Sequence, residues 1–314
     1  MGLSLAVVAV QRPRIDRMTL HPQSQALLDT MAGGDEEALT PEHVAQVRSE
    51  ARAAAMAAKK IGLDHVEDLD ADGVPCRLYR PRQGAPVALY VHGGGWVFHD
   101  LETHDAFCRY LAHETGWALL AVDYRRAPEH PFPAPLDDVQ TAARWLRGHD
   151  REHRVDASFL PGIGDSSGAN LIAGLCVREP GALDFQALVY PPVDRRAVLP
   201  TELENTALDG PGMDEFWDAY APGDLGDHPE VSVVNATNLA EHPPAYVVTN
   251  EHDVLRDQAE AYAALLASAG VDVLAHRALG MVHSFWRQPE AFDASRHTVT
   301  LVGALLDSRR MRTR

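Results

Sequence analysis

The 314-residue sequence has only three cysteines and a marked shortage of basic residues. Cys76, Cys108 and Cys176 are far apart and form no C-x-x-C pair, so neither a disulfide framework nor a zinc site is predicted. The formal net charge of −17 disfavours a nucleic-acid-binding surface, which needs a basic patch. We therefore expect a reducing, cytoplasmic environment, no nucleic-acid partner, no metal and no cofactor.

Long apolar runs are also missing. The apolar stretch within residues 1–14 follows no basic residue and is too short to span a bilayer, so no stable membrane association is expected. A weak signal peptide is the alternative for this stretch. Since 46% of the residues are hydrophobic, a large core is expected, and the globular part should begin near Met18 after a tail.

The glycine-rich stretch "GIGDSSGAN", residues 162–170, fits one motif and not another. A dinucleotide fingerprint, G-x-G-x-x-G, needs glycine where Ser167 stands. The nucleophile elbow, G-x-S-x-G, fits with Ser166 at its centre, whereas centring it on Ser167 would require glycine in place of Asp165 and Ala169. The spacing therefore predicts Ser166 as a nucleophile on a sharp turn from strand to helix.

Strand and helix patterns alternate from Gly73 onward, which predicts an α/β fold with a mainly parallel sheet and helices on both faces. Residues 20–60 are predicted to be helical. Residues 194–243 interrupt the alternation with a stretch rich in proline, glycine and acidic residues, typical of a cap or lid over the active edge. Pro161 conflicts with a central strand over residues 157–164, so a bulge or a shortened strand is expected there.

A serine nucleophile needs backbone N–H donors for the negative oxygen that forms during attack on a carbonyl. The sequence "HGGGW", residues 92–96, follows a predicted strand and matches the oxyanion loop of lipases and esterases. We expect Gly94 and a neighbour, Gly93 or Gly95, to donate, with the N–H of Ser167 as a third donor.

A serine nucleophile also needs a base and an orienting acid, which follow it along the chain in this fold. Asp253 lies just past the predicted strand "AYVVTN", and His283 follows the last predicted strand; both are strand-end positions where catalytic groups gather. Ser166, His283 and Asp253 are therefore the predicted triad. Nearby residues of the same types fit less well by position: Glu251, His252, Asp257 and His276.

Together these motifs resemble those of the hormone-sensitive-lipase-like family of α/β-hydrolases, in its bacterial carboxylesterase branch with a GDSAG-type elbow. The resemblance covers about residues 78–286. Ser167 stands where the family commonly has alanine, and Val254 replaces a common proline. The motifs occur in the family's order: "HGGGW", "DYRRAPEHPFPAPLDD", "GDSSGAN", "YPPVD", "DVLRD" and "GMVHSF".

The resemblance implies an α/β-hydrolase fold with a helical cap. Residues 1–60 would form a tail and cap helices, and residues 61–314 a catalytic domain with the cap insertion at about 194–243. The expected activity is hydrolysis of short to medium acyl carboxylic esters, with a small-molecule ester as partner and a homodimer as assembly. The residues expected to contact substrate are Trp96, Phe216, Trp217 and Tyr220.

Two other functions remain open on the same fold. Plant gibberellin receptors resemble this family but lack the base histidine, so a small-molecule receptor is the alternative outside enzymes. Amide or lactone hydrolysis is the alternative among enzymes, because a triad alone does not separate these reactions from ester cleavage.

Overall fold

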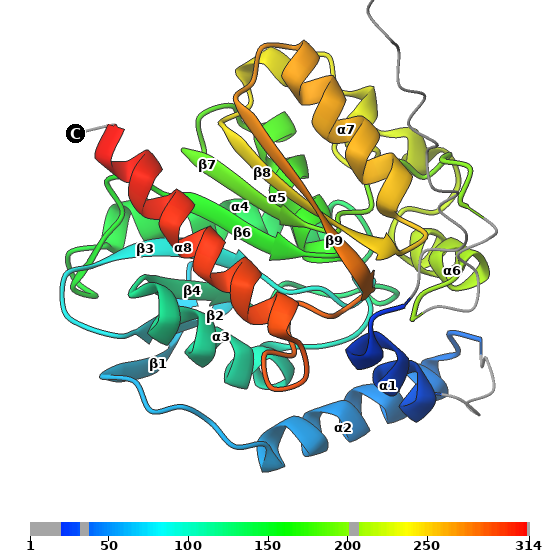
Figure 1. Ribbon diagram of the computed structural model, residues 1–314. Helices are drawn as coiled ribbons and strands as arrows, with labels where there is room; N and C mark the ends of the chain where they lie inside the picture. The colour runs from blue at the N-terminus through cyan, green and yellow to red at the C-terminus, as the bar shows by residue number, and fades with distance from the viewer. Residues whose placement is uncertain (1–19, 32–37, 201–206, 313–314) are drawn as a thin grey trace, which may run out of the picture.

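The computed structural model describes residues 20–31, 38–200 and 207–312. A nine-stranded sheet forms the centre of this part of the chain, as Figure 1 shows. The strands are β1 (His65–Ala71), β2 (Val74–Arg80), β3 (Ala85–Val91), β4 (Ala118–Val122), β5 (Val155–Asp156), β6 (Pro161–Asp165), β7 (Phe185–Val189), β8 (Ala245–His252) and β9 (Val273–Val282).

The strand order is β1-β2-β4-β3-β6-β7-β8-β9, with the short β5 paired to the start of β3. The pairs β1–β2 and β2–β4 are antiparallel, and all pairs from β4 to β9 are parallel. The predicted mainly parallel α/β sheet is thus confirmed. Because the parallel strands all end at one edge, the loops that follow them meet there.

Helices cover both faces of the sheet (Figure 1). Val87, Leu89 and Val91 of β3 belong to one apolar core, shared with α4, α5 and α7, whereas Ala88 and Tyr90 belong to another, shared with α3 and α8. The α-helices are α1 (Pro22–Met31), α2 (Pro41–Ala57), α3 (Leu101–Thr115), α4 (Ala134–His149), α5 (Ser167–Arg178), α6 (Gly210–Tyr220), α7 (Arg256–Ser268) and α8 (Asp293–Arg312).

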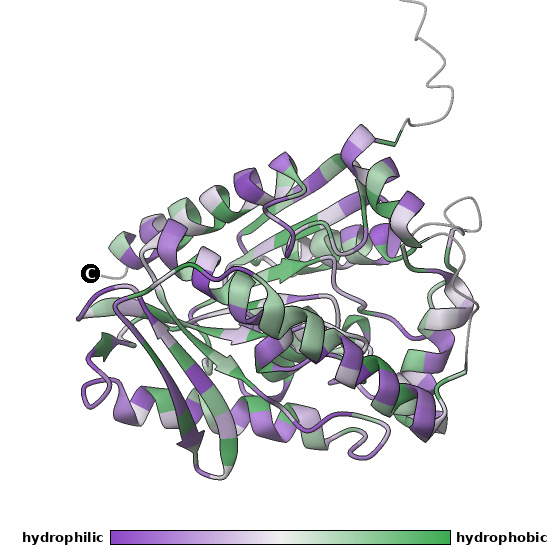
Figure 2. Cartoon of the chain, turned by 90° about the horizontal axis from the view of Figure 1, so that it is seen from below, coloured by the Kyte–Doolittle hydropathy of each residue, from purple (hydrophilic) through white to green (hydrophobic). Residues whose placement is uncertain are grey.

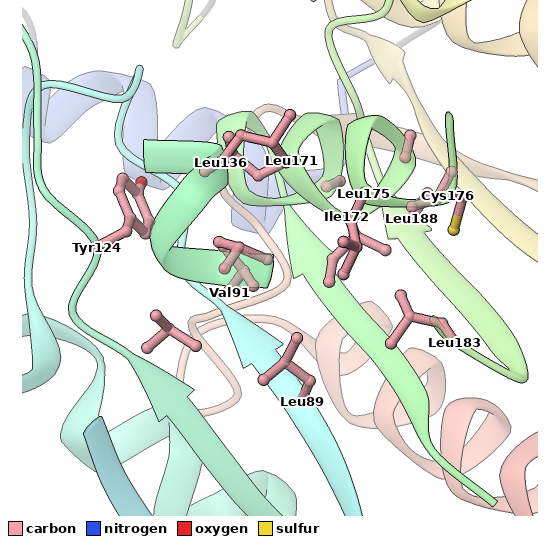
Figure 3. Close-up of a cluster of buried hydrophobic side chains, with 14 of the residues drawn as sticks. Leu89, Val91, Tyr124, Leu136, Leu171, Ile172, Leu175, Cys176, Leu183 and Leu188 are labelled. Carbon is pink, nitrogen blue, oxygen red and sulfur yellow. The ribbon is translucent and has the colours of Figure 1, made fainter. Parts of the chain in front are cut away.

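Helix α5, which follows Ser166, is buried over most of its length, from Ser167 to Cys176. Leu171 and Leu175 of this helix belong to the same buried apolar cluster as Leu89 and Val91 of β3, part of which Figure 3 shows. Closely packed apolar side chains leave little freedom for the helix to shift. The turn that carries Ser166 is therefore held by a rigid strand on one side and a rigid helix on the other.

The outer helices are amphipathic, and Figure 2 shows hydrophilic and hydrophobic residues side by side along them. Helix α3, for example, buries Phe107 and Leu111 against the sheet while Glu114 is exposed. At the start of α2, the side chain of Thr40 accepts a hydrogen bond from the N–H of His43 at 3.2 Å, as the predicted N-cap requires.

Pro161 is the first residue of β6, a position where the missing N–H of proline removes no ladder hydrogen bond from a strand interior. The strand expected over residues 157–164 is therefore shortened at its beginning, and β6 pairs in regular register with β7 from Pro161 to Asp165. Among the strands and α-helices, three were not predicted from the sequence: the edge strand β1, the short strand β5 and the C-terminal helix α8.

The insertion at 194–243 contains the expected short helix, α6, where residues 212–221 predicted one. Asp209 caps this helix by accepting a hydrogen bond from the N–H of Gly212 at 2.8 Å. Three short 3-10 helices follow: η2 (Gly223–Asp227), η3 (Val233–Asn235) and η4 (Leu239–Glu241). The tail expected before Met18 and residues 201–206 of the insertion lie outside the described residues.

Candidate active site

Ser166 occupies the sharp turn between β6 and α5 with φ +50° and ψ −125°, a conformation that is strained for any residue with a side chain. The neighbouring glycines are required by space. A Cβ on Gly164 would lie 2.5 Å from the backbone of Gly168, and a Cβ on Gly168 would collide with the carbonyl of Val91. The turn is fixed further by a 2.8 Å hydrogen bond from the N–H of Ser166 to the carbonyl of Val189.

Ser166, His283 and Asp253 lie in one hydrogen-bonded line, although 117 residues separate the first two in sequence. Nε2 of His283 lies 3.0 Å from Oγ of Ser166, and Nδ1 lies 2.7 Å from Oδ2 of Asp253. A carboxylate accepts hydrogen bonds only, so Nδ1 carries the proton and Nε2 is free to accept the serine proton. All three side chains are buried.

Asp253 is held by two further donors. Asn250 donates from Nδ2 to Oδ2 at 2.8 Å, and the backbone N–H of Leu255 donates to Oδ1 at 2.9 Å. These bonds fix the carboxylate that orients His283. Asn250 is a functional neighbour that the sequence analysis missed; its place at the end of β8, three residues before Asp253, was the available signal.

The glycine loop after β3 lies beside the serine. Gly94 and Gly95 line the cavity at Ser166 and have φ values of +124° and +61°, which glycine adopts readily. The N–H of Gly93 instead donates to Oδ1 of Asp165 at 3.2 Å. The expectation that Gly93 could be an oxyanion donor is therefore wrong, and Gly95 is the neighbour that fits.

Ser167 is the third predicted donor. It is the first residue of α5 and lines the same cavity. Backbone N–H groups in the first turn of a helix have no partner within the helix, and the helix dipole favours negative charge there. Gly94, Gly95 and Ser167 thus all line the cavity that Ser166 lines.

His92 supports the loop rather than facing the substrate cavity. Its ring stacks on Tyr124 at a centroid distance of 4.4 Å, and its Nδ1 lies 2.8 Å from the carbonyl of Gly93. Burial, with the nearby His104 in second place, lowers the pKa of His92 to about 3, so the ring is neutral at physiological pH. Tyr124 comes from the "DYRR" segment and donates to the carbonyl of His92 at 3.0 Å.

The cavity beside Ser166 has a volume of about 150 Å³ and mostly apolar walls. Two of the residues expected to contact substrate, Trp96 and Phe216, line it. Trp217 and Tyr220 do not line this cavity, and the Tyr220 ring stacks on Trp96 with centroids 4.5 Å apart. The expectation that these two contact substrate is corrected, because their side of α6 packs behind the cavity wall.

The alternative acids and the alternative base are engaged elsewhere. Glu251 accepts a hydrogen bond from the N–H of Gly280 at 2.6 Å, and Asp257 pairs with Arg256 at 2.7 Å. His276 contacts the Tyr246 hydroxyl at 3.2 Å and does not line the cavity. Position at the strand end had favoured Asp253 and His283, and the structure places those two together.

A serine on a strained turn after a central parallel strand, with a histidine and an aspartate from later strand ends, defines an α/β-hydrolase. Comparison with known proteins agrees. Residues 88–287 match a protein family described by the alpha/beta hydrolase fold. The chain is 36% identical to carboxylesterase NlhH of Mycobacterium tuberculosis over 301 residues, which cover 87% of this chain and 91% of that protein.

Two further similarities extend over nearly the whole chain. An ethyl acetate hydrolase of Pseudomonas putida is 32% identical over 311 residues, covering 91% of this chain and 98% of that protein. The solved structure of a hyperthermophilic esterase from Pyrobaculum calidifontis superposes with a TM-score of 0.84 at 32% identity, covering 93% and 99% of the two chains. The chain therefore belongs to the hormone-sensitive-lipase-like α/β-hydrolases, and it is a carboxylic ester hydrolase.

Two features of the described residues bear on partners. No helix in this part of the chain has the length and apolar character needed to cross a bilayer. No group of three or more histidine, cysteine or acidic side chains within it is arranged to hold a metal ion. Cys76, Cys108 and Cys176 are all buried free thiols.

Proposed function

We propose that the protein hydrolyses short to medium acyl esters through a covalent acyl-enzyme, with Ser166 as nucleophile, His283 as base and Asp253 as the orienting acid. The observation that carries this proposal is the hydrogen-bonded line from Oγ of Ser166 through His283 to Asp253, at 3.0 and 2.7 Å. Both distances are within the range needed for proton transfer and for holding the ring.

In the first half-reaction, Oγ of Ser166 attacks the carbonyl carbon while its proton passes to Nε2 of His283. The carbonyl oxygen becomes negative and accepts hydrogen bonds from the N–H groups of Gly94, Gly95 and Ser167. Asp253 stabilises the imidazolium that forms. Nε2 then donates the proton to the departing alkoxide, which leaves as the alcohol while the acyl group stays on Ser166.

In the second half-reaction, water takes the place of the alcohol. His283 removes a proton from this water as its oxygen attacks the acyl carbon, and the same donors stabilise the second tetrahedral intermediate. The bond to Oγ of Ser166 then breaks, and His283 returns the proton to that oxygen. The products are a carboxylic acid and the free enzyme, and no cofactor is needed.

The decisive test compares two adjacent serines. Ser166→Ala should reduce kcat by about 10⁴-fold or more, whereas Ser167→Ala should retain most activity because its backbone N–H remains. Both variants should show wild-type circular dichroism spectra. Wild-type rates in Ser166→Ala, or equal loss in both variants, would overturn the assignment of the nucleophile.

The substrate size is supported by the small volume of the cavity beside Ser166, about 150 Å³. Rates on p-nitrophenyl esters of about two to sixteen carbons should be greatest on the shorter chains and should show no jump when the substrate aggregates. A maximum on the longest chains would contradict this proposal. Turnover of amides or lactones at rates above those of esters would favour the alternative hydrolases, and no turnover at all would favour a receptor.

We also propose that α1, α2 and the insertion at 194–243 form a cap over a catalytic domain that spans residues 61–314. Phe216 of α6 lines the cavity at Ser166, and Arg48 of α2 donates to the carbonyl of Val97 at 2.8 Å, just past the glycine loop. Deleting residues 1–35 should therefore shift the preference for acyl length. An unchanged preference and unchanged stability would contradict the cap.

Two further proposals concern the oligomeric state of the protein and its location in the cell. Strand β9 is at the end of the sheet, and the exposed Leu274 and Leu279, at 40% and 69% exposure, support a homodimer through this edge. Leu279→Asp should then shift the sedimentation coefficient towards that of a monomer, and a wild-type monomer at all concentrations would contradict the dimer. Three buried free thiols support a cytoplasmic location, which fractionation of cells tests directly.

A further inference from the structure

A second cavity adjoins the one at Ser166. It has a volume of about 410 Å³ and lies against α1, α3 and the loop after β9. The two cavities share three lining residues, Ala207, Ser284 and Arg287. The two cavities therefore meet at these residues.

The walls of both cavities are mostly apolar, with one permanent positive charge. Leu27, Met31 and Phe107 line the second cavity, and Phe98 and Leu208 line the first. Arg287 is the only lysine or arginine among the described residues that line either cavity. The charge thus lies where the two spaces meet.

Arg287 forms no ion pair with an acid in the part of the chain that the structure describes. Within the described chain, no carboxylate lies at ion-pair distance from its guanidinium and no side-chain hydrogen bond engages it, although the residue is partly buried. The cationic side chains of Arg195 and Arg277, on the same protein, both pair with acids at 2.7 Å or less. Removing a guanidinium partly from water without a partner is unfavourable, so a ligand that supplies an anion would be stabilised there.

The other titratable groups of the cavity do not satisfy this cation. Burial, followed by the charge of Arg287, lowers the pKa of His99 well below its ordinary value, so His99 stays neutral. Asp165 is the acid that lines the catalytic cavity, and its Oδ1 already accepts hydrogen bonds from the Tyr90 hydroxyl at 2.8 Å and from the N–H of Gly93. The charge of Arg287 also helps to lower the pKa of Asp165, but no hydrogen bond or ion pair joins these two side chains, so the guanidinium N–H groups remain available to a substrate.

We infer that Arg287 binds a carboxylate carried by the substrate, so that the preferred esters are anionic. A guanidinium presents parallel N–H donors that match a carboxylate, and the surrounding apolar walls strengthen such a pair. The net charge of −17 otherwise repels anions, so a local cation is needed for one to enter the site. This inference rests on the proposed function, because the ester must still be cleaved at Ser166.

The carboxylate can be on either side of the ester bond, and two substrate pairs distinguish these cases. Monoethyl glutarate carries it on the acyl side, and its control is the corresponding ethyl ester of glutaramic acid. O-acetyl lactate carries it on the alcohol side, and its control is O-acetyl lactamide. For at least one pair, wild-type kcat/KM measured by titration of released acid should favour the carboxylate by about ten- to a hundredfold.

Variants at Arg287 test whether this residue causes the preference for the carboxylate ester over its amide control. Arg287→Gln should bring the ratio of kcat/KM for the acid and its amide close to one, and Arg287→Lys should retain part of the preference. The ratio within one variant does not depend on the fraction of folded enzyme. Arg82→Gln removes one positive charge from an exposed turn between β2 and β3 and should leave the wild-type ratio unchanged.

Equal wild-type rates on acid and amide in both pairs would overturn the inference. So would a ratio that Arg287→Gln leaves intact, or one that Arg82→Gln lowers as much. In each case the amide esters are still cleaved and the proposed function stands. Continued cleavage of the amide esters by Ser166→Ala would instead overturn the proposed function.

Discussion

The carboxylate of Asp165 holds the backbone of Gly93: its Oδ1 accepts the Gly93 N–H at 3.2 Å. Asp165 ends β6 immediately before Ser166, and Gly93 precedes the two glycines that line the cavity, Gly94 and Gly95. The nucleophile turn and the oxyanion loop are therefore tied together by one buried side chain. Burial acts to raise the pKa of Asp165, but His104, the charge of Arg287 and the Tyr90 hydroxyl outweigh it and lower the pKa.

Breaking this tie should impair the chemical step more than substrate binding. We expect Asp165→Ala to lower kcat about tenfold or more with a smaller change in KM, because oxyanion donors act mainly in the transition state. Asp165→Asn keeps an oxygen acceptor for Gly93 and should lose less. Steady-state kinetics on one neutral ester measures kcat and KM for both variants. A wild-type kcat in Asp165→Ala would show that the glycine loop keeps its conformation without the hydrogen bond to Asp165.

Gly95 combines a positive φ with a close neighbour. A Cβ at this position would collide with the ring of Phe216, and φ is +61°. Gly95→Ala should therefore reduce kcat about tenfold or more, since either the loop or the ring must move. The double variant Gly95→Ala/Phe216→Ala removes the collision but not the strain, so it should recover part of the loss. Full activity in Gly95→Ala would mean that this N–H is not a donor.

Two adjacent aromatic residues of α6 should have different roles: Phe216 should affect substrate preference, and Trp217 should affect stability. Phe216 lines the cavity, whereas Trp217 is only 2% exposed and packs against Trp96 with ring centroids 4.5 Å apart. Trp217→Ala should lower the free energy of unfolding by about 3–5 kcal/mol. Phe216→Ala should change the preference for acyl length with a smaller loss of stability. Denaturant titrations and ester profiles measure the two effects, and a reversed pattern would contradict the orientation of α6.

The buried histidine His242 should make the free energy of unfolding smaller in mild acid. Burial lowers the pKa of His242 to about 4, and neither ring nitrogen has a hydrogen-bond partner among the described residues. The unfolded chain binds a proton at this residue below about pH 6.5, and the folded protein does so only near pH 4. The free energy of unfolding should thus fall as pH decreases through this window, by up to about 1.4 kcal/mol per pH unit for this residue.

His242→Leu should flatten that dependence by up to one proton between about pH 6.5 and 4.5. The measurement is a series of urea titrations at several pH values. Leu239→Ala serves as control: it removes a buried side chain three residues away and should lower stability equally at every pH. An unchanged slope in His242→Leu would show that the histidine is already charged in the folded protein.

The sequence predicted the elements that position the site because their patterns are local. The strands at β3, β6, β8 and β9 carry apolar runs, and the catalytic candidates follow them at the edge where parallel strands end. Strand β1 was not predicted, because its sequence "HVEDLDA" is mostly polar and it becomes a strand by pairing with β2. Tertiary pairing here overrides weak local propensity.

The errors at the site have a different origin. Whether the N–H of Gly93 faces the substrate or Asp165 depends on one backbone rotation, which glycine permits in either direction. Likewise, the aromatic residues of α6 were grouped by spacing, but which of them faces the cavity depends on how the helix is rotated when it packs on Trp96. Sequence predicted which residues gather at the site, and packing decides which way each one points.

The backbone angles of Ser166 have a consequence for how this enzyme can be improved. A positive φ at a residue with a side chain is unfavourable by about 1–3 kcal/mol, and glycine would relieve it. Ser166→Gly should thus yield a protein that melts at a higher temperature and has no activity. A library screened for thermal resistance alone would accumulate this substitution, so directed evolution of this chain must select for turnover and heat resistance in the same round.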